Sequence, residues 1–253
     1  MDDRMTFECF GLVIHGLDWR GTLSRIDEAI LHGTKTWIVT ANPEIMLAAK
    51  RDAGYWQTLR QADLRLVDGF GLKLVGWLSG ASPKRMTGVD LSERLVALAE
   101  ERGWGVALVG AKEGIADKVA WKLRKQHPKL RLVAEQGGAI DKTGAGDVAS
   151  DEALHRLTMN APDLLLVAFG HPKQEEWIRR YVDTLPSVKV AVGVGGTFDY
   201  WSGTAKPAPA FRRALGLAWL WRLLREPRRW RRILDAVIVF PWTFITDRFS
   251  SSR

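Results

Sequence analysis

Short apolar runs alternate with amphipathic segments from about residue 10 to residue 202, and this alternation constrains the fold more than any other feature. Several runs are near-continuous in Val, Leu and Ile, which is typical of strands covered on both faces. Residues 90–103 and 113–126 have apolar positions three and four apart and are expected to be helices, the first capped by Asp90 with Glu93 as its partner. The expected strands are residues 10–16, 36–42, 64–69, 105–110, 130–137, 163–170 and 188–196. This order predicts an α/β fold with a doubly wound, mostly parallel sheet.

The composition changes after about residue 203, where the chain becomes helical in pattern, aromatic and basic. Residues 203–232 contain nine Lys or Arg and one acidic residue, Glu226, so they carry the whole net charge of +8. A charge excess this local predicts a segment that docks on a negative partner. We therefore expect two parts, a catalytic domain over 1–202 and a basic, Trp-rich helical appendage over 203–253.

Several classes of protein and site are excluded or disfavoured by what the sequence lacks. Cys9 is the single cysteine, which excludes an internal disulfide framework, and the first ten residues do not resemble a signal peptide. There is no CxxC, no pair of His at metal-ligand spacing, no GxSxG and no P-loop. No Asp-x-Asp follows a strand, so we expect no metal and expect Lys, Arg and backbone amides to neutralise any bound diphosphate.

Polar and glycine residues gather where the expected strands end. Because ligands of open α/β sheets bind outside the carboxyl ends of the strands, these residues are expected to share one binding rim. They are Thr40, Asn42 and Glu44; Asp68, Gly69 and Gly71; Gly110; Gly137 and Gly138; His171, Lys173, Gln174 and Glu175; and Gly195, Gly196, Phe198 and Asp199.

Each of these residues also has an ordinary structural interpretation. Strand-end Gly, Asn and Asp commonly form turns and helix caps. Asp68 could begin a turn, Glu175 could complement the dipole of its helix, and His171 precedes Pro172, which favours a turn. Lys173 at a helix start could instead meet a phosphate.

Six motifs occur in order: TANPEIMLAAK, VDGFGLKLVGW, KRMTGVDL, FGHPKQEEWI, GVGGTFDYWSGTAKPAP and GLAWLWRLLREPRRWRR. In combination they resemble the WecG/TagA/CpsF family of bacterial glycosyltransferases (glycosyltransferase family twenty-six). The resemblance implies a Rossmann-like core with a membrane-associating C-terminal appendage. It also implies inverting, metal-independent transfer from a UDP-sugar to a polyprenyl-diphosphate-linked sugar at the cytoplasmic membrane face, in the synthesis of surface polysaccharide such as teichoic acid, common antigen, capsule or exopolysaccharide. No cofactor beyond the UDP-sugar donor is implied.

The resemblance also assigns roles to residues. Asp68 of the DGxG motif is the implied base, and Thr40, Asn42, Arg85 and Gln174 complete the catalytic set. For the UDP-sugar we expect contacts from Gly69, Gly110, Gly137, Lys173, Glu175, Gly195, Phe198 and Asp199. The chain departs from the family at Pro207, where an Arg is frequent, and at Ala218, where a Glu is frequent.

The appendage is expected to attach to an anionic membrane surface. Arg222, Arg225, Arg229 and Arg232 recur at three, four and three residues, which places them on one face of a continuous helix, with Trp219 and Trp221 beside them. The stretch ILDAVIVFPWTFI is only thirteen residues long, below the roughly twenty that span a bilayer, so the attachment is expected to be peripheral.

Three alternatives remain at this point. A nucleotide-binding oxidoreductase would need GxGxxG after the first strand, where this chain reads GLVIHGLDWRG. A nucleic-acid binder could use the Arg-rich tail, but the apolar stretch behind the arginines favours lipid, so no nucleic acid is expected. The tail could instead pack on the core or on another subunit, which leaves a homo-oligomer open.

Overall fold

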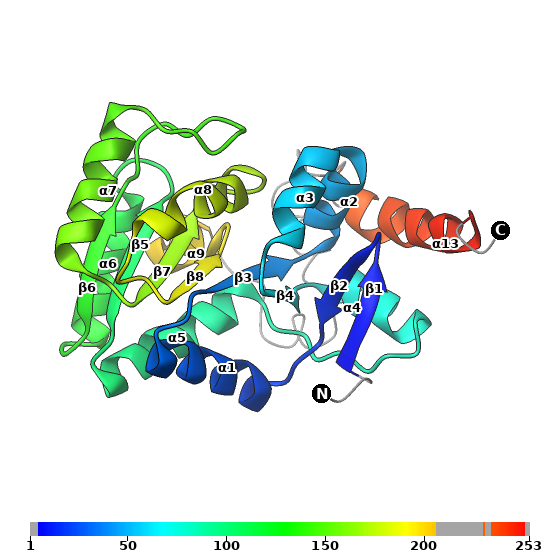
Figure 1. The fold of residues 1–253 in the computed structure, drawn as a ribbon, viewed down its shortest axis with the longest axis horizontal. Helices are drawn as coiled ribbons and strands as arrows, with labels where there is room; N and C mark the ends of the chain where they lie inside the picture. The colour runs from blue at the N-terminus through cyan, green and yellow to red at the C-terminus, as the bar shows by residue number, and fades with distance from the viewer. Residues whose placement is uncertain (1–4, 206–229, 231–233, 251–253) are drawn as a thin grey trace.

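The computed structural model describes residues 5–205, 230 and 234–250. An eight-stranded sheet in the order β1-β2-β4-β3-β8-β7-β5-β6 runs through the centre (Figure 1). All neighbouring strands are parallel except β1 and β2, which form an antiparallel hairpin at one edge. The strands are β1 Thr6–Cys9, β2 Leu12–His15, β3 Thr36–Ala41, β4 Leu64–Val67, β5 Gly105–Gly110, β6 Arg131–Glu135, β7 Leu164–Ala168 and β8 Val190–Gly193. The expected α/β class with a mostly parallel sheet is confirmed.

Helices cover both faces of the sheet. One face packs on α2 Pro43–Arg51, α3 Ala53–Arg60, α4 Phe70–Leu78, α7 Val148–Asn160 and α8 Lys173–Tyr181, which continues into the short 3₁₀ helix η2 Val182–Thr184. The other face packs on α1 Trp19–His32, α5 Gly88–Arg102, α6 Ile115–Gln126 and α9 Thr197–Ser202. Two hydrophobic clusters result, each taking alternate residues of the same strands, which is why the central strands are apolar at most positions.

The sheet has a topological switch point between β3 and β8. After β3 the chain passes to α2 on one face, whereas after the neighbouring β8 it passes to α9 on the other. Adjacent strands whose connections leave in opposite directions form the crevice in which open α/β sheets bind ligands. The fold therefore predicts a site at the carboxyl ends of β3 and β8.

The edge hairpin differs from the sequence expectation. The expected strand over 10–16 is shorter, and β1, which the sequence did not predict, precedes it. Phe10 and Gly11 form the turn with φ of 51° and 75°, the positive values that a tight hairpin turn requires at both central residues. Phe is rarely found in this conformation, and the Phe10 ring is held by aromatic contacts with Phe240 and Phe244.

Helix α5 also begins earlier than expected. Its N-cap is Thr87, whose hydroxyl oxygen accepts from the Asp90 amide at 3.1 Å and donates to the Asp90 carboxylate at 2.7 Å. Asp90 is thus the capping-box partner rather than the cap, and the expected pairing of Asp90 with Glu93 is wrong. The earlier start places Gly88, the first helical residue, at the rim of the sheet.

The described end of the chain packs on the core of the α/β domain. A π-helical turn, η4 Asp235–Val239, leads into α13 Phe240–Ser250, which lies beside α2 (Figure 1). Phe240 and Phe244 are buried in the same hydrophobic cluster as residues of α2 and α4. The alternative in which the tail packs on the core therefore describes these two residues. Within 5–205 and 234–250, no helix is both long enough and apolar enough to cross a bilayer.

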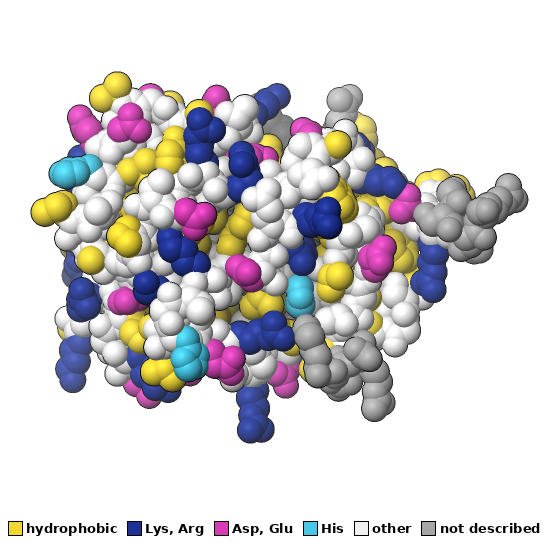
Figure 2. All heavy atoms as spheres, viewed as in Figure 1, with side chains coloured by type: hydrophobic (Ala, Val, Ile, Leu, Met, Phe, Trp, Pro, Cys, Tyr) yellow, Lys and Arg dark blue, Asp and Glu magenta, His cyan; other side chains and the backbone are white. Residues whose placement is uncertain are grey.

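Basic side chains do not gather on the face seen in Figure 2, where Lys and Arg are scattered among acidic and apolar groups. The dense basic run identified in the sequence falls mainly on residues 206–229 and 231–233, which lie outside the described residues. The proposed division at residue 202 therefore remains a prediction.

Candidate active site

Asp68 lies at the carboxyl end of β4, at the edge of the crevice. Its amide donates to the carbonyl of Ala41 at 2.7 Å, which ties it to the end of β3. Its Oδ2 accepts from the Gly88 amide at 3.2 Å, at the N-terminus of α5. The side chain is partly buried. The positive end of the α5 dipole therefore faces this carboxylate and any anion bound beside it.

Gly69 and Arg85 adjoin Asp68 on two sides. Gly69 has a φ of 92° and begins α4, so it turns the chain sharply away from the rim. Arg85 is partly buried, and the amide of the next residue, Met86, donates to the carbonyl of Val67 at 2.8 Å. The backbone at Arg85 therefore runs beside the end of β4, next to Asp68.

Thr40 and Asn42 occupy the end of β3. The buried Thr40 hydroxyl donates to the carbonyl of Gly193 at 2.9 Å and so fastens β3 to β8. Asn42 caps α2, where its Oδ1 accepts from the Ile45 amide at 3.0 Å. A Cβ on Gly88 would lie 3.3 Å from Thr40 Oγ1, so the glycine lets α5 approach β3 closely.

Gln174 fixes the loop that follows β8. Its side chain is only 2% exposed, and its Oε1 accepts from the Gly195 amide at 3.0 Å. Its Nε2 donates to Glu175 at 2.7 Å, and a Cβ on Gly193 would lie 2.8 Å from that nitrogen. Gln174 is therefore a buried residue that holds the Gly195 turn, where φ is 52°, through this hydrogen bond.

Glu175 and Phe198 lie inside the protein. Glu175 is fully buried and accepts from the Tyr55 hydroxyl at 3.0 Å. Burial raises the pKa of Glu175, against the hydrogen bond from Gln174, and burial beside Glu175 raises the pKa of Tyr55. Phe198 is likewise fully buried and stacks on Trp201. Both residues were expected to contact the donor directly, whereas the structure places them where they support the rim.

Gly110, Gly137 and Lys173 form a second group at the ends of β5, β6 and β7. A Cβ on Gly110 or Gly137 would lie 3.0 Å or 2.5 Å from the ring of Phe169, so both glycines make room for that ring. Lys173 donates to the carbonyl of Ile140 and ties α8 to the loop after β6. Asp199 is partly buried in the first turn of α9, beside the Gly195 turn.

His171 and Glu44 are in contact, which the sequence did not predict. His171 Nε2 lies 3.4 Å from Glu44 Oε2, which joins the β7–α8 loop to α2 across the crevice. Both side chains are about a quarter exposed. The sequence showed that Glu44 and His171 both follow strands that end at this rim. Their contact depends on the order of the strands in the sheet, which only the structure gives.

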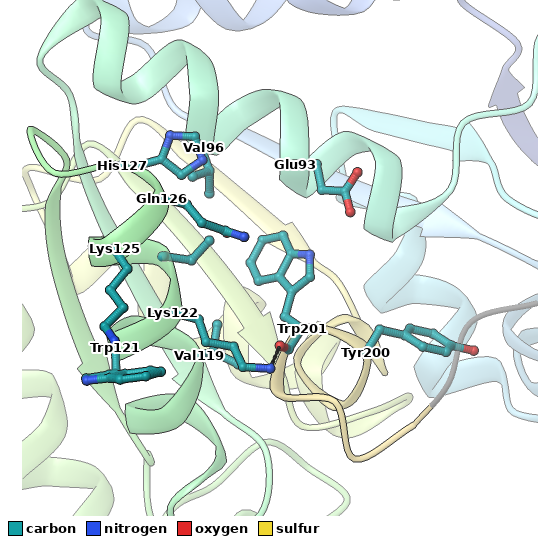
Figure 3. Close-up of a pocket in the computed structure, with 11 residues that line it drawn as sticks. Glu93, Val96, Val119, Trp121, Lys122, Lys125, Gln126, His127, Tyr200 and Trp201 are labelled. Carbon is teal, nitrogen blue, oxygen red and sulfur yellow. Dashed lines mark hydrogen bonds between the residues drawn. The ribbon is translucent and has the colours of Figure 1, made fainter.

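A wide groove of about 770 Å³ lies between α5, α6 and α9 (Figure 3). It extends from Glu93 in α5 to His127 after α6, and the Trp201 carbonyl on its wall accepts from Lys122 Nζ at 3.0 Å. The rim residues Asp68 and Gln174 do not line it. It runs along the helix layer on one face, so we place the chemistry at the strand ends instead.

The six residues expected to contact the membrane or the lipid diphosphate, Arg222, Arg225, Arg229, Arg232, Trp219 and Trp221, lie outside the described residues. In the part of the chain that the structure does describe, no three His, Cys, Asp or Glu side chains gather closely enough to hold a metal ion.

Comparison with known proteins identifies the family of this chain. Residues 7–253 match the profile of the glycosyl transferase WecG/TagA/CpsF family. The chain belongs to this family. The protein is thus a glycosyltransferase, as the six motifs predicted.

Two relatives of this glycosyltransferase are both named N-acetylglucosaminyldiphosphoundecaprenol N-acetyl-beta-D-mannosaminyltransferase. The protein from Bacillus spizizenii is 33% identical over 215 residues, which cover 84% of this chain and 80% of the relative. The protein from Bacillus subtilis is 32% identical over 199 residues, which cover 78% of this chain and 75% of the relative.

Proposed function

We propose that this glycosyltransferase moves a sugar from a UDP-sugar to a polyprenyl-diphosphate-linked sugar, with inversion and without a metal, during surface polysaccharide synthesis. The names of both relatives support a polyprenyl-diphosphate-linked acceptor, and they make N-acetylmannosamine the first sugar to test. The single observation that carries the proposal is Asp68, a carboxylate oriented by the Gly88 amide at the mouth of the β3–β8 crevice.

The proposed chemistry is one displacement at the anomeric carbon. The acceptor hydroxyl oxygen forms a bond to that carbon on the side opposite to UDP, and the bond from the carbon to the UDP oxygen breaks. Asp68 takes the hydroxyl proton, because a hydroxyl is a poor nucleophile until its proton is removed. UDP leaves with the bonding electrons, so its charge grows as the reaction proceeds.

Donors of hydrogen bonds and positive charge near the crevice are suited to that leaving group. The N-terminus of α5 faces Asp68, and the backbone of Arg85 runs beside it. Backbone amides, a helix N-terminus and a guanidinium group stabilise developing phosphate charge. Gly195 lacks a Cβ, which lets a ligand approach its backbone, and Gln174 keeps this turn in place.

The test is release of UDP from a panel of UDP-sugars in the presence of a short-chain N-acetylglucosaminyl diphosphate lipid. UDP-N-acetylmannosamine is expected to be turned over, and turnover is expected to persist in excess EDTA. Asp68→Asn keeps the size of the side chain but not its basicity, so we expect turnover to fall about 10²-fold or more.

Glu44→Gln is the matched control, since Glu44 is another partly buried carboxylate at this rim. It is expected to lower turnover less than Asp68→Asn. A larger loss for Glu44→Gln would move the role of base to the Glu44–His171 pair. Loss of activity in EDTA that magnesium restores would overturn the metal-independent reaction.

The six residues that the sequence predicts to contact the membrane or the lipid diphosphate lie outside the described residues. We keep the proposal that the arginines at 222, 225, 229 and 232 meet anionic lipid or the acceptor diphosphate, with Trp219 and Trp221 in the headgroup region. Several basic residues at about 1 kcal/mol each are enough for reversible peripheral binding at the cytoplasmic face.

A further inference from the structure

Helix α4 is apolar on every side and yet lies at the surface. Its sequence, FGLKLVGWL, contains one charged residue, Lys73. The inner side of the helix is buried at Leu72 and Val75, whereas Phe70 and Trp77 on the outside are 43% and 46% exposed. A helix that is hydrophobic all round is normally enclosed by protein or by lipid. In the part of the chain that the structure describes, protein leaves Phe70 and Trp77 on the outer side of α4 exposed.

The π-helical turn η4 and α13 together form one helical segment, the C-terminal helix, which lies beside α4 along its length. Near the start of α4, a Cβ on Gly71 would lie 3.0 Å from the Ala236 carbonyl oxygen and 3.5 Å from the Phe240 ring. At the end of α4, Arg248 donates to the Leu78 carbonyl at 3.1 Å. The two helices therefore run side by side in the same direction at one end of the molecule (Figure 1).

The C-terminal helix is also apolar on two sides. Phe240 and Phe244 point into the core, whereas Ile238, Trp242 and Ile245 are exposed, Trp242 at 69%. The exposed residues are four and three apart, so they share one side of the helix. We call the exposed set from both helices the apolar platform; its residues are Phe70, Trp77, Leu78, Ile238, Trp242 and Ile245.

The polar groups at the platform match a lipid headgroup region better than a protein partner. Lys73 Nζ lies 4.8 Å from the centre of the Trp77 ring, and the Phe70 ring meets Trp77 edge-on. Arg248 borders the other end, while Asp247 is paired with Lys50. Trp is enriched at membrane interfaces, where its ring lies at the headgroup level, and helices that lie in the interface carry Trp, Phe and Leu on the apolar side with Lys and Arg reaching toward the phosphates.

We propose that the apolar platform inserts into the interfacial region of an anionic bilayer, with α4 of the catalytic domain as one of its two contact helices. Membrane contact is therefore not confined to the C-terminal segment. Because α4 begins directly after Asp68 and Gly69, this orientation places the candidate base near the headgroups. That last step rests on the proposed function, since only a lipid-linked acceptor requires it.

The test is flotation of the full-length protein with vesicles of phosphatidylglycerol and phosphatidylcholine, and with phosphatidylcholine alone. The double variant Trp77→Ser/Trp242→Ser is expected to lower the fraction bound to the anionic vesicles about tenfold or more, because each ring buries apolar area in the bilayer. Trp77→Phe/Trp242→Phe keeps most of that area and is expected to restore binding. Trp121→Ser is the control, since Trp121 is an exposed Trp on α6, on the opposite face of the sheet.

Unchanged vesicle binding by the double serine variant would overturn the inference. So would a change from dimer to monomer in sedimentation with vesicle binding unaffected, because the platform would then be an interface between copies. Transfer to a water-soluble short-chain acceptor reports separately on the proposed function. If the wild-type protein transfers no sugar but the variant still loses vesicle binding, the function is wrong and the platform stands.

Discussion

Replacing Phe240 with Ala is expected to release the C-terminal helix from the domain. Phe240 is fully buried, and its ring lies edge-on to Phe10 with centroids 5.9 Å apart. Burying one Phe side chain contributes about 1.5–3 kcal/mol, so Phe240 and Phe244 together supply about 3–6 kcal/mol of docking free energy. Truncating a buried Phe to Ala costs about 3–5 kcal/mol, of which the aromatic pair accounts for about 1. Phe240→Ala should therefore remove half or more of the docking free energy.

Native-state hydrogen exchange can measure this loss locally. A loss of about 3 kcal/mol corresponds to an increase of roughly a hundredfold in the opening of residues 240–248. The Phe10–Gly11 turn should also exchange faster, because the Phe10 ring loses a partner that holds it at a positive φ. Exchange in β5 and β7, in the middle of the sheet, should change least.

Trp242→Ala is the matched control on the same helix. Trp242 is 69% exposed, so the free energy of unfolding should change by no more than about 0.5 kcal/mol. If Phe240→Ala raised exchange of the helix no more than Trp242→Ala, the two aromatic anchors would not be what holds the helix. These two variants also distinguish the role of the core from that of the apolar platform, since Phe240 is buried and only Trp242 belongs to the proposed lipid contact.

Two further predictions concern the interior. Gln174→Ala is expected to lower kcat about tenfold or more by releasing the Gly195 turn, while the protein still unfolds cooperatively; unchanged kcat and donor KM would show that the turn holds itself. His15 accepts a hydrogen bond from the Arg65 amide at 3.1 Å, and burial, with nearby Arg65, lowers its pKa to about 4. Because the unfolded chain binds this proton below about pH 6.5 and the folded chain does not, about 2 kcal/mol of stability should be lost between pH 7 and pH 5. His15→Asn keeps an acceptor for the amide without the titration, so urea unfolding of the variant should depend less on pH in this window, and an equal dependence would contradict the assignment.

The central strands could be predicted from the sequence because each is apolar at most positions. β5 lies at the expected residues 105–110, since a strand buried on both faces has a run of Val, Leu and Ile that turn residues end on each side. β1 was missed because it is four residues long, contains Glu8, and turns at Phe10, which is not a typical turn residue. A contact with Phe240, 230 positions away, stabilises that turn, and no local pattern contains such a contact.

The ends of strands could be predicted, but the direction of each side chain on the following helix could not. Lys173, Gln174 and Glu175 are consecutive, and on a helix successive side chains point about 100° apart. Gln174 therefore reaches the Gly195 turn while Glu175 enters the core beside Tyr55. The sequence places both residues next to the strand end, and only the packing of α8 against α3 separates their roles.

The layered α/β architecture, the edge of the sheet with the candidate site and the family all followed from the sequence alone, because they depend on periodicity and on motifs within short segments. The tertiary structure decided which apolar surfaces are covered. Helix α4 and the C-terminal helix are apolar on both their inner and outer sides, so their patterns do not tell which side meets the core. The positions of Gly71 against Phe240 and of Phe240 against Phe10 settle it. Which side of a helix is buried depends on contacts between residues that are distant in the sequence. In this protein those contacts bury the inner sides of the two helices and leave their outer sides exposed next to each other.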